Sequence, residues 1–258
     1  MNSIIFKKEN GVGFIHLNRP EVYNSFNREM AFQMHEALDA CANDEEVRCV
    51  LIEGTGKAFC AGQDLSEVVD PNGPALENIV SEHYNPMIMK ITSLEKPVMC
   101  AVNGIAAGAG ANIALACDVI IAKTSAAFLQ AFSKIGLIPD SGGTWTLPRA
   151  IGYQKALAIT MLGDKISANE AEAMGMIYKA VEDEEYEDYV MKIASKLAGM
   201  PTKGLAFTKK AYQLSMNQKL EEQLKTEGDY QFKASKTYDY SEGVQAFLDK
   251  RKPEFKGK

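Results

Sequence analysis

Short apolar runs that alternate with helical patterns constrain the fold of this 258-residue chain more than any other feature. Three β-rich runs, at 47–54, 97–104 and 118–123, are separated by longer stretches, some with apolar residues at helical spacing. Parallel strands need a crossover connection, and a helix commonly provides it. The alternation therefore predicts an α/β core with a parallel sheet.

The residues before the first run predict a hairpin and a helix. Two short β-rich segments within 3–20 flank Asn10-Gly11, a dipeptide typical of two-residue hairpin turns. A further helical stretch is expected from about 74 to 94. Asn27 is the expected N-cap of the first helix, whose apolar positions share one face: Met30, Met34, Ala37, Leu38 and Cys41.

The last third of the chain is predicted to be helical. Ser167 and Glu170 stand at the spacing of a capping box, which marks a helix start. A short last helix is expected before Pro253, which should stop it. Pro201 and Asn217 separate the preceding helical patterns, at 184–200, 202–216 and 220–235.

This change of character divides the chain into an α/β core, residues 1–200, and a helical C-terminal region, residues 201–258. The apolar faces of the C-terminal region exceed what a thin appendage can bury by itself. We therefore expect this region to pack between the subunits of an oligomer.

Composition argues against several classes of function. The net charge is −6 and no long basic run occurs, so nucleic-acid binding is not expected. No apolar run approaches the roughly 20 residues of a membrane span, and the N-terminus lacks the apolar segment of a signal peptide. We expect a soluble, cytoplasmic protein that does not enter a membrane.

Nucleophilic triads and metal sites have little support in the sequence. The five cysteines are an odd number, form no CxxC pair and lie mostly in apolar runs, so reduced, buried thiols are expected. His16, His35 and His83 lie in strand or helical patterns, where structural or surface roles are typical. The spacing of metal ligands is absent, so no metal is expected.

Two stretches rich in small residues follow strand patterns. The first contains Ala58, Ala61 and Gly62, and the second, 104–110, leads into an apolar helix at 109–116. Small residues allow a ligand to approach the backbone. Two loops that each aim one N–H at the same oxygen would form an oxyanion hole. Tight turns and close helix packing explain the same residues, so both interpretations stay open.

Asp140 also has two interpretations. It follows Pro139 and precedes Ser141, and a helix is expected to begin near Gly142-Gly143. Asp is a preferred N-cap, although Ser141 could cap this helix by itself. A carboxylate can also move a proton. The residues alone do not decide between a cap and a proton carrier.

Four ordered motifs resemble the crotonase, or enoyl-CoA hydratase/isomerase, superfamily. They are LNRPEVYNSFN at 17–27, GKAFCAGQDL at 56–65, KPVMCAVNGIAAGAG at 96–110 and IGLIPDSGGTWTLPR at 135–149; the tail at 242–255 also fits. The resemblance implies a spiral of ββα units with a helical C-terminal trimerisation region. It further implies an acyl-CoA thioester substrate, a homotrimer or dimer of trimers, and no metal or redox cofactor, since coenzyme A is part of the substrate.

The resemblance also implies roles for individual residues. The backbone N–H groups of Gln63 and Ala109 take the place of two oxyanion-hole donors that stabilise the enolate of a CoA thioester. Arg19 and Val22 fall where the family meets the nucleotide end of CoA. The implied substrate-binding residues are Arg19, Val22, Ala61, Gly62, Asp64, Leu65, Gly108, Asn112 and Phe132.

Three positions depart from the pattern of typical hydratases. Such hydratases carry a catalytic Glu at the positions of Asn112 and Phe132, and they usually carry Gly at the position of Asp140. Asn112 has no proton to exchange near neutral pH, and Phe132 can only line a pocket. The pattern resembles the 2-(1,2-epoxy-1,2-dihydrophenyl)acetyl-CoA isomerases of bacterial phenylacetate breakdown.

One carboxylate opposite an oxyanion hole suffices for isomerisation, whereas hydration also needs an activated water. We therefore predict an acyl-CoA isomerase in which Asp140 relays a proton between two carbons, with conversion of the ring epoxide to oxepin-CoA as the expected reaction. An enoyl-CoA hydratase and a Δ3,Δ2-enoyl-CoA isomerase of β-oxidation are alternatives. An alternative of another class is a non-catalytic acyl-CoA-binding protein of the same fold.

Overall fold

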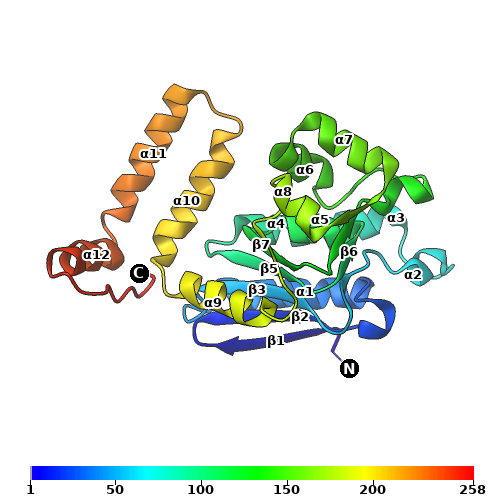
Figure 1. Ribbon diagram of the computed structural model, residues 1–258, viewed down its shortest axis with the longest axis horizontal. Coiled ribbons are helices and arrows are strands. Elements are labelled where there is room, and N and C mark those ends of the chain that lie inside the picture. The colour runs from blue at the N-terminus through cyan, green and yellow to red at the C-terminus, as the bar shows by residue number, and fades with distance from the viewer. Residues whose placement is uncertain (1) are drawn as a thin grey trace.

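Two β-sheets form the centre of the molecule (Figure 1). The structure is a computed structural model that describes residues 2–258. The first sheet has the strand order β1 (Ile4–Glu9), β2 (Val12–Leu17), β3 (Cys49–Gly54), β5 (Val98–Val102), β7 (Val119–Lys123) and β10 (Lys179–Val181). The second has the order β4 (Ala58–Cys60), β6 (Ile105–Ala107), β8 (Ala127–Leu129) and β9 (Lys165–Ser167).

The predicted hairpin and parallel sheet are confirmed. β1 and β2 pair antiparallel across Asn10-Gly11, and both residues of this turn have positive φ. β2, β3, β5, β7 and β10 then pair in parallel. In the second sheet β4, β6 and β8 are parallel, and β9 closes the edge antiparallel to β8.

One unit repeats along the chain: a strand of the first sheet, a strand of the second sheet, and then helix. The repeat is the spiral of ββα units that the resemblance implied. After β3 and β4 come α2 (Leu65–Val69), α3 (Leu76–Asn78), a π-helix (Ile79–Tyr84) and α4 (Asn85–Ser93). After β5 and β6 comes α5 (Ala109–Leu115), and after β7 and β8 come a 3-10 helix (Ala131–Ile135) and α6 (Gly143–Ile151).

The inner strands β3 and β5 of the first sheet are buried on both faces, which explains their nearly continuous apolar sequence. Val50 and Ile52 face the main core with α1 (Arg28–Asn43) and α4. Leu51, between them, points to the opposite face, which α9 (Tyr186–Ala198) covers. As predicted, the Asn27 side chain caps α1 by accepting a hydrogen bond from the Met30 N–H.

Several local expectations need correction or addition. The stretch 74–94 is helical but divides into α3, the π-helix and α4. The three-residue strands of the second sheet and α7 (Tyr153–Leu162) were not predicted. The capping box of Ser167 and Glu170 is confirmed at the start of α8 (Ala168–Ala173). All five cysteines are buried and free, as expected.

The C-terminal helices stand apart from the sheets, at the left of Figure 1. They are α10 (Thr202–Ser215), α11 (Leu220–Ala234) and α12 (Tyr238–Leu248). The expected stop at Pro253 is wrong, because α12 ends at Leu248 and the chain continues without regular structure. Within residues 2–258, no helix is both long and apolar enough to cross a bilayer.

Arg48 joins the two ends of this region to the core. Its guanidinium donates hydrogen bonds to the carbonyl oxygens of Met200 (2.6 Å) and Phe255 (2.7 Å), and to Thr202 Oγ1 (3.2 Å). Arg48 precedes β3, so the start and the end of the C-terminal region meet beside the first sheet.

Candidate active site

In the loop after β4, the backbone N–H of Gln63 is left without a protein acceptor among the described residues. The Phe26 N–H donates to the Gly62 carbonyl at 2.7 Å, and the Asp64 N–H donates to the Phe26 carbonyl at 2.8 Å. In a trans peptide the C=O and the following N–H point in opposite directions. The Gln63 N–H therefore points away from Phe26, and within residues 2–258 it donates to no protein acceptor.

The junction of β6 and α5 presents a second N–H in the same way. Gly108 has φ 54° and ψ −127°, a conformation that strongly favours glycine. Its carbonyl accepts from the Asn112 N–H (3.2 Å), which turns the Ala109 N–H out of the start of α5. This N–H too donates to no acceptor in the part of the chain that the structure describes.

These two loops lie in contact. β4 and β6 pair in parallel, so the residues that follow them leave the same edge of the second sheet. A Cβ placed on Gly62 would lie 2.9 Å from the Ala107 carbonyl oxygen and 3.4 Å from the Ala109 nitrogen. Gly62 also has φ +95°. The small residues thus serve close packing, and this packing brings the Gln63 and Ala109 segments together.

A strained turn places Asp140. Ser141 has φ 50° and Gly142 has φ 74°, and α6 begins only at Gly143. The Ser141 hydroxyl donates to Asp140 Oδ1 at 2.8 Å, and no N–H of α6 donates to either side chain within residues 2–258. The capping role that the sequence allowed for Asp140 is therefore not the one in the structure. Backbone strain of this kind in a non-glycine residue often accompanies function.

Burial changes the acidity of Asp140. The half-buried carboxyl loses solvent, which raises its pKa above the usual value for Asp, and the hydrogen bond from Ser141 offsets only part of this rise. Phe132 is buried beside the second loop, with its Cζ 3.9 Å from the position of a Cβ on Gly108. A carboxyl whose pKa is raised by burial near an apolar ring is typical of a group that transfers protons.

Asn112 connects Asp140 to α5. Its Nδ2 donates to the Asp140 carbonyl oxygen at 2.9 Å, and its Oδ1 accepts from Gln130 Nε2 at 2.8 Å. Asn112 lies one turn after Ala109, so this bond fixes Asp140 close to the start of α5. The side chain is fully buried, and its expected contact with substrate stays a prediction.

The residues expected at the nucleotide end of CoA lie beside the first loop. Arg19 donates to the Ser25 carbonyl (2.6 Å) and to Asp64 Oδ2 (2.9 Å). Burial would raise the pKa of Asp64, but hydrogen bonds from Ser66 and Arg19 hold it below its usual value. Val22 is half-buried at the end of a 3-10 helix (Pro20–Val22).

Two further residues of the predicted set reach solvent. Ala61 is exposed, and its N–H donates to the Tyr23 carbonyl at 2.9 Å, which joins the first loop to the 3-10 helix segment. Leu65 opens α2 and is 55% exposed. The structure thus brings the predicted residues together around one edge of the second sheet.

Other chemistry has little support at this place. Cys60 lies under the first loop, 3.4 Å from the Gly62 nitrogen, but burial raises the pKa of its thiol to about 12, so it is not a nucleophile near neutral pH. Among the described residues, no group of three or more His, Cys, Asp or Glu side chains could hold a metal ion.

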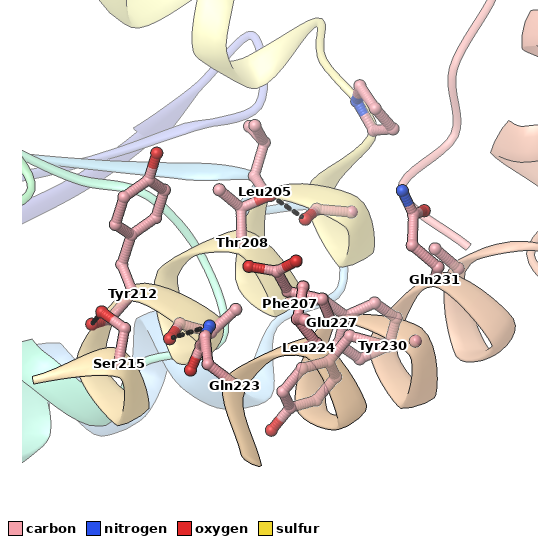
Figure 2. Close-up of a pocket in the computed structure, with 15 residues that line it drawn as sticks. Leu205, Phe207, Thr208, Tyr212, Ser215, Gln223, Leu224, Glu227, Tyr230 and Gln231 are labelled. Atoms are coloured by element: carbon pink, nitrogen blue, oxygen red, sulfur yellow. Dashed lines mark hydrogen bonds between the residues drawn. The ribbon is translucent and has the colours of Figure 1, made fainter. Parts of the chain in front are cut away.

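A cavity of about 740 Å³ lies elsewhere, between α10 and α11 (Figure 2). Figure 2 shows apolar and aromatic side chains of both helices around it, among them Leu205, Phe207, Leu224 and Tyr230. It lies in the C-terminal region, which stands apart from the two loops in Figure 1. We therefore place the candidate active site at the loops and not in this cavity.

Tyr84 belongs to the site although the sequence did not single it out. It ends the π-helix, is fully buried, and donates from its hydroxyl to Gln63 Oε1 at 2.9 Å. The helical pattern at 74–94 predicts a buried face but not which side chain reaches a loop 21 residues earlier.

Comparison with known proteins identifies the family to which the chain belongs. The enoyl-CoA hydratase/isomerase family model matches residues 7–258. The chain is 49% identical to the 1,2-epoxyphenylacetyl-CoA isomerase of Escherichia coli (strain K12), with 100% of both chains covered. It is 43% identical to a Rhodobacter capsulatus protein named probable enoyl-CoA hydratase, covering 100% of this chain and 99% of that one.

Solved structures give the same result for the fold. An enoyl-CoA hydratase from Bacillus anthracis has a TM-score of 0.93 with this structure at 32% identity, covering 99% of this chain and 100% of that one. Whole-chain coverage in sequence and structure leaves the two loops and Asp140 inside the shared architecture. The protein is therefore an enzyme of the enoyl-CoA hydratase/isomerase, or crotonase, family.

Proposed function

We propose that the protein is an acyl-CoA isomerase in which Asp140 relays a proton between two carbons of one substrate. The observation that carries this proposal is the half-buried Asp140 carboxyl, with its raised pKa, next to two loops that each present a free backbone N–H. Asn112 and Phe132 stand where the hydratases that the chain resembles carry two further acids. A single acid–base group suits isomerisation better than the activation of water.

The chemistry uses two parts of the site. The Gln63 and Ala109 N–H groups donate to the thioester oxygen as it gains negative charge. Asp140, as carboxylate, takes a proton from the carbon next to the thioester, and the resulting enolate is stabilised at its oxygen. The proton then returns to another carbon, so the double bond moves and no atom is gained or lost. Burial helps here because a base with a raised pKa is stronger.

The proposed substrate is 2-(1,2-epoxy-1,2-dihydrophenyl)acetyl-CoA, with oxepin-CoA as the product. The 49% identity over the whole chain to a 1,2-epoxyphenylacetyl-CoA isomerase supports this choice. In this reaction the carbon–carbon bond that the epoxide shares with the six-membered ring breaks, which expands the ring to the seven-membered oxepin. Asp140 would assist by moving one proton from the carbon next to the thioester to a ring carbon, so substrate and product contain the same atoms. Arg19, Val22, Asp64 and Leu65 would bind the CoA part, and no further cofactor is needed.

A product assay with three substrates tests the proposal. Purified protein is given the ring-epoxidised phenylacetyl-CoA, a 3-enoyl-CoA and crotonyl-CoA, and the products are identified by mass spectrometry. Conversion of the epoxide with no gain of water is the expected result. Faster conversion of the 3-enoyl-CoA would favour a Δ3,Δ2-enoyl-CoA isomerase, and hydration of crotonyl-CoA would favour a hydratase. Binding without turnover of any of the three would contradict both the proposed substrate and the proposed reaction.

We also propose a homotrimer, or a dimer of trimers, in the cytoplasm, with residues 201–258 as the oligomerisation region; residue 1 of the core lies outside the described residues. Apolar side chains on the C-terminal region support this. Those that are more than half exposed in the single chain include Tyr212, Met216, Leu220, Leu224, Phe232, Tyr240, Phe247 and Leu248. Exposed apolar surface of this extent is typical of an interface between subunits.

A further inference from the structure

The side chain of Gln63 is bound on both sides. Its Oε1 accepts a hydrogen bond from the Tyr84 hydroxyl at 2.9 Å, and its Nε2 donates to Glu67 Oε2, also at 2.9 Å. A phenol has a proton to donate and a carboxylate can only accept, so the two partners together determine which way the amide is turned. We call Tyr84 and Glu67 the Gln63 clamp.

Both members of the Gln63 clamp are anchored in turn. Glu67 lies in α2, and its Oε1 accepts from the Arg28 N–H at 2.7 Å, which ties α2 to the start of α1. Tyr84 is fully buried, and its ring lies 6.2 Å from the ring of Phe26, centre to centre. Phe26 is the residue that bonds the backbone on either side of Gln63. The first loop is therefore held by its backbone on one side and by the Gln63 side chain on the other.

We propose that Tyr84 and Glu67 are positioning residues, which keep the Gln63 backbone N–H aimed at the thioester oxygen by holding the Gln63 side chain. This rests on the proposed function, because it assumes that the Gln63 N–H is an oxyanion donor. A donor contributes to catalysis only where it points at the place of developing charge. Gly62 has the most permissive backbone of any residue type, so the loop needs a constraint beyond its own sequence.

Two features of Tyr84 suit this role. It ends a π-helix, a rare form that occurs mostly as a single turn within α-helices and is frequent at functional sites. The pKa of its hydroxyl is well above the usual value, first because of burial and then because of the neighbouring Cys60 and Asp140. The hydroxyl therefore remains a donor across the pH range of any assay.

The first experiment compares Tyr84→Phe with a matched control. Tyr186 is also buried (4% exposed), and its hydroxyl has no hydrogen-bond partner within residues 2–258, so Tyr186→Phe removes the same atom away from the site. We expect Tyr84→Phe to lower kcat about tenfold with KM changed less than about twofold, since it leaves the half-buried Gln63 amide oxygen without its donor. Tyr186→Phe should keep the parent kcat. Equal kcat in the parent and in Tyr84→Phe would overturn the proposal.

The second experiment reads the oxyanion donors directly. An unreactive saturated acyl-CoA with a ¹³C-labelled thioester carbonyl is bound, and its C=O stretch is measured by isotope-edited infrared spectroscopy. Donors aimed at the oxygen polarise the carbonyl and lower its frequency relative to free ligand. We expect a clear lowering in the parent and in Tyr186→Phe, and a smaller one in Tyr84→Phe. A full lowering in Tyr84→Phe would overturn the positioning role.

The same measurement separates this proposal from the proposed function. If the parent protein binds the acyl-CoA without lowering the frequency, the oxyanion hole itself is misplaced, and the inference on Tyr84 falls with it. If the parent lowers the frequency but isomerises none of the substrates, the proposed reaction is wrong while the Gln63 clamp can still be judged by the infrared shift.

A double-mutant cycle tests whether Tyr84 acts through Gln63. Gln63→Met keeps the backbone N–H and removes the amide that Tyr84 contacts. If Tyr84 acts through that amide, adding Tyr84→Phe to Gln63→Met should change kcat by less than about twofold, because interacting residues are not additive. A further tenfold loss would mean that Tyr84 acts by another route and would overturn the proposal.

Discussion

The loops around Asp140 and the C-terminal helices differ in where their interactions are completed. Around Asp140, the groups that hold the loops find partners within the same chain, whereas the N–H groups of Gln63 and Ala109 lack an acceptor among residues 2–258. Asn112 bonds Gln130 and the Asp140 carbonyl, and Phe26 bonds the backbone on both sides of Gln63. In the C-terminal region, large apolar side chains such as Phe247 (84% exposed) have no cover. The groups around Asp140 are thus held by partners of their own chain, whereas the exposed apolar side chains of the helical region are those that the proposed oligomer would cover.

Replacement of the proposed acid should have the largest effect. We expect Asp140→Asn to reduce turnover by about 10²–10⁴-fold, the usual contribution of a positioned acid or base, while acyl-CoA binding survives. Steady-state kinetics and a binding titration measure the two quantities. The exposed Asp164→Asn is the matched control and should keep the parent rate. Turnover at the parent rate in Asp140→Asn would show that the carboxylate is a structural residue. The loops around Asp140 would then not be the place of proton transfer.

The contact between the two loops should be the next most sensitive feature. Gly62→Ala would place a Cβ 2.9 Å from the Ala107 carbonyl oxygen at a φ of +95°, so the loops must separate. We expect kcat to fall roughly 10–100-fold and the free energy of unfolding to fall by about 1–3 kcal/mol.

A control separates the effect of backbone strain from that of contact. Gly152 has φ +82° with nothing within 4 Å of its Cβ position, so Gly152→Ala carries similar backbone strain without the contact. It should lower stability, measured by chemical denaturation, and leave kcat close to that of the parent. Similar losses of kcat in both variants would show that the close approach of the loops does not matter for turnover.

The oligomeric state tests whether the exposed apolar surface of the C-terminal helices is an interface between subunits. Phe247→Asp puts a charge on an exposed apolar surface of α12. If this surface is an interface, the dissociation constant should rise roughly tenfold to a hundredfold for each Phe247 that is buried there. This factor corresponds to the free energy of burying one large apolar side chain. Analytical ultracentrifugation across a dilution series measures this. A parent protein that is monomeric at every concentration would contradict the proposed trimer.

The smallest effect concerns stability and its dependence on pH. The pKa of Asp140 is raised in the folded chain. As pH rises from the ordinary Asp value toward the folded value, the unfolded chain releases its proton first, so stability falls, and this loss is complete above the folded pKa. Asp140→Asn has no carboxyl at this position, so its free energy of unfolding does not decrease in this way. The variant should be slightly more stable than the parent at neutral pH, and the difference should vanish below about pH 3.9. Urea denaturation at several pH values measures it, and a less stable variant at neutral pH would contradict the sign.

Local signals predicted the parts of the fold that depend on neighbouring residues. Asn10-Gly11 marked the hairpin turn, Asn27 marked the start of α1, and the apolar runs marked the strands of the first sheet. The second sheet was missed because its strands have three residues each, too few for an alternating pattern to show. Each of these strands pairs with strands that lie far from it in the sequence.

The site was predictable only in part, for a related reason. The small residues and Asp140 stood out by type and position, and the resemblance supplied their proposed roles. The contacts of Tyr84 with Gln63 and of Asn112 with the Asp140 carbonyl join residues 21 and 28 positions apart. Side-chain contacts across such separations follow from the packing of whole elements and leave no periodic trace in the sequence.

The hydrogen bonds of Arg48 have a topological consequence. Because Met200 and Phe255 both bind one guanidinium, the chain leaves the core and returns to it at nearly the same point. The helices α10 to α12 therefore form a loop of the chain whose two ends lie close together. A short linker could join these ends at little cost in loop-closure entropy. A core shortened in this way would lose the hydrogen bonds that Lys209 and Gln213 of α10 donate to the carbonyl oxygens of Ile91 and Thr92 at the end of α4. Because Arg48 binds both ends, the helices between them can change in length without moving the points at which the chain leaves and rejoins the core.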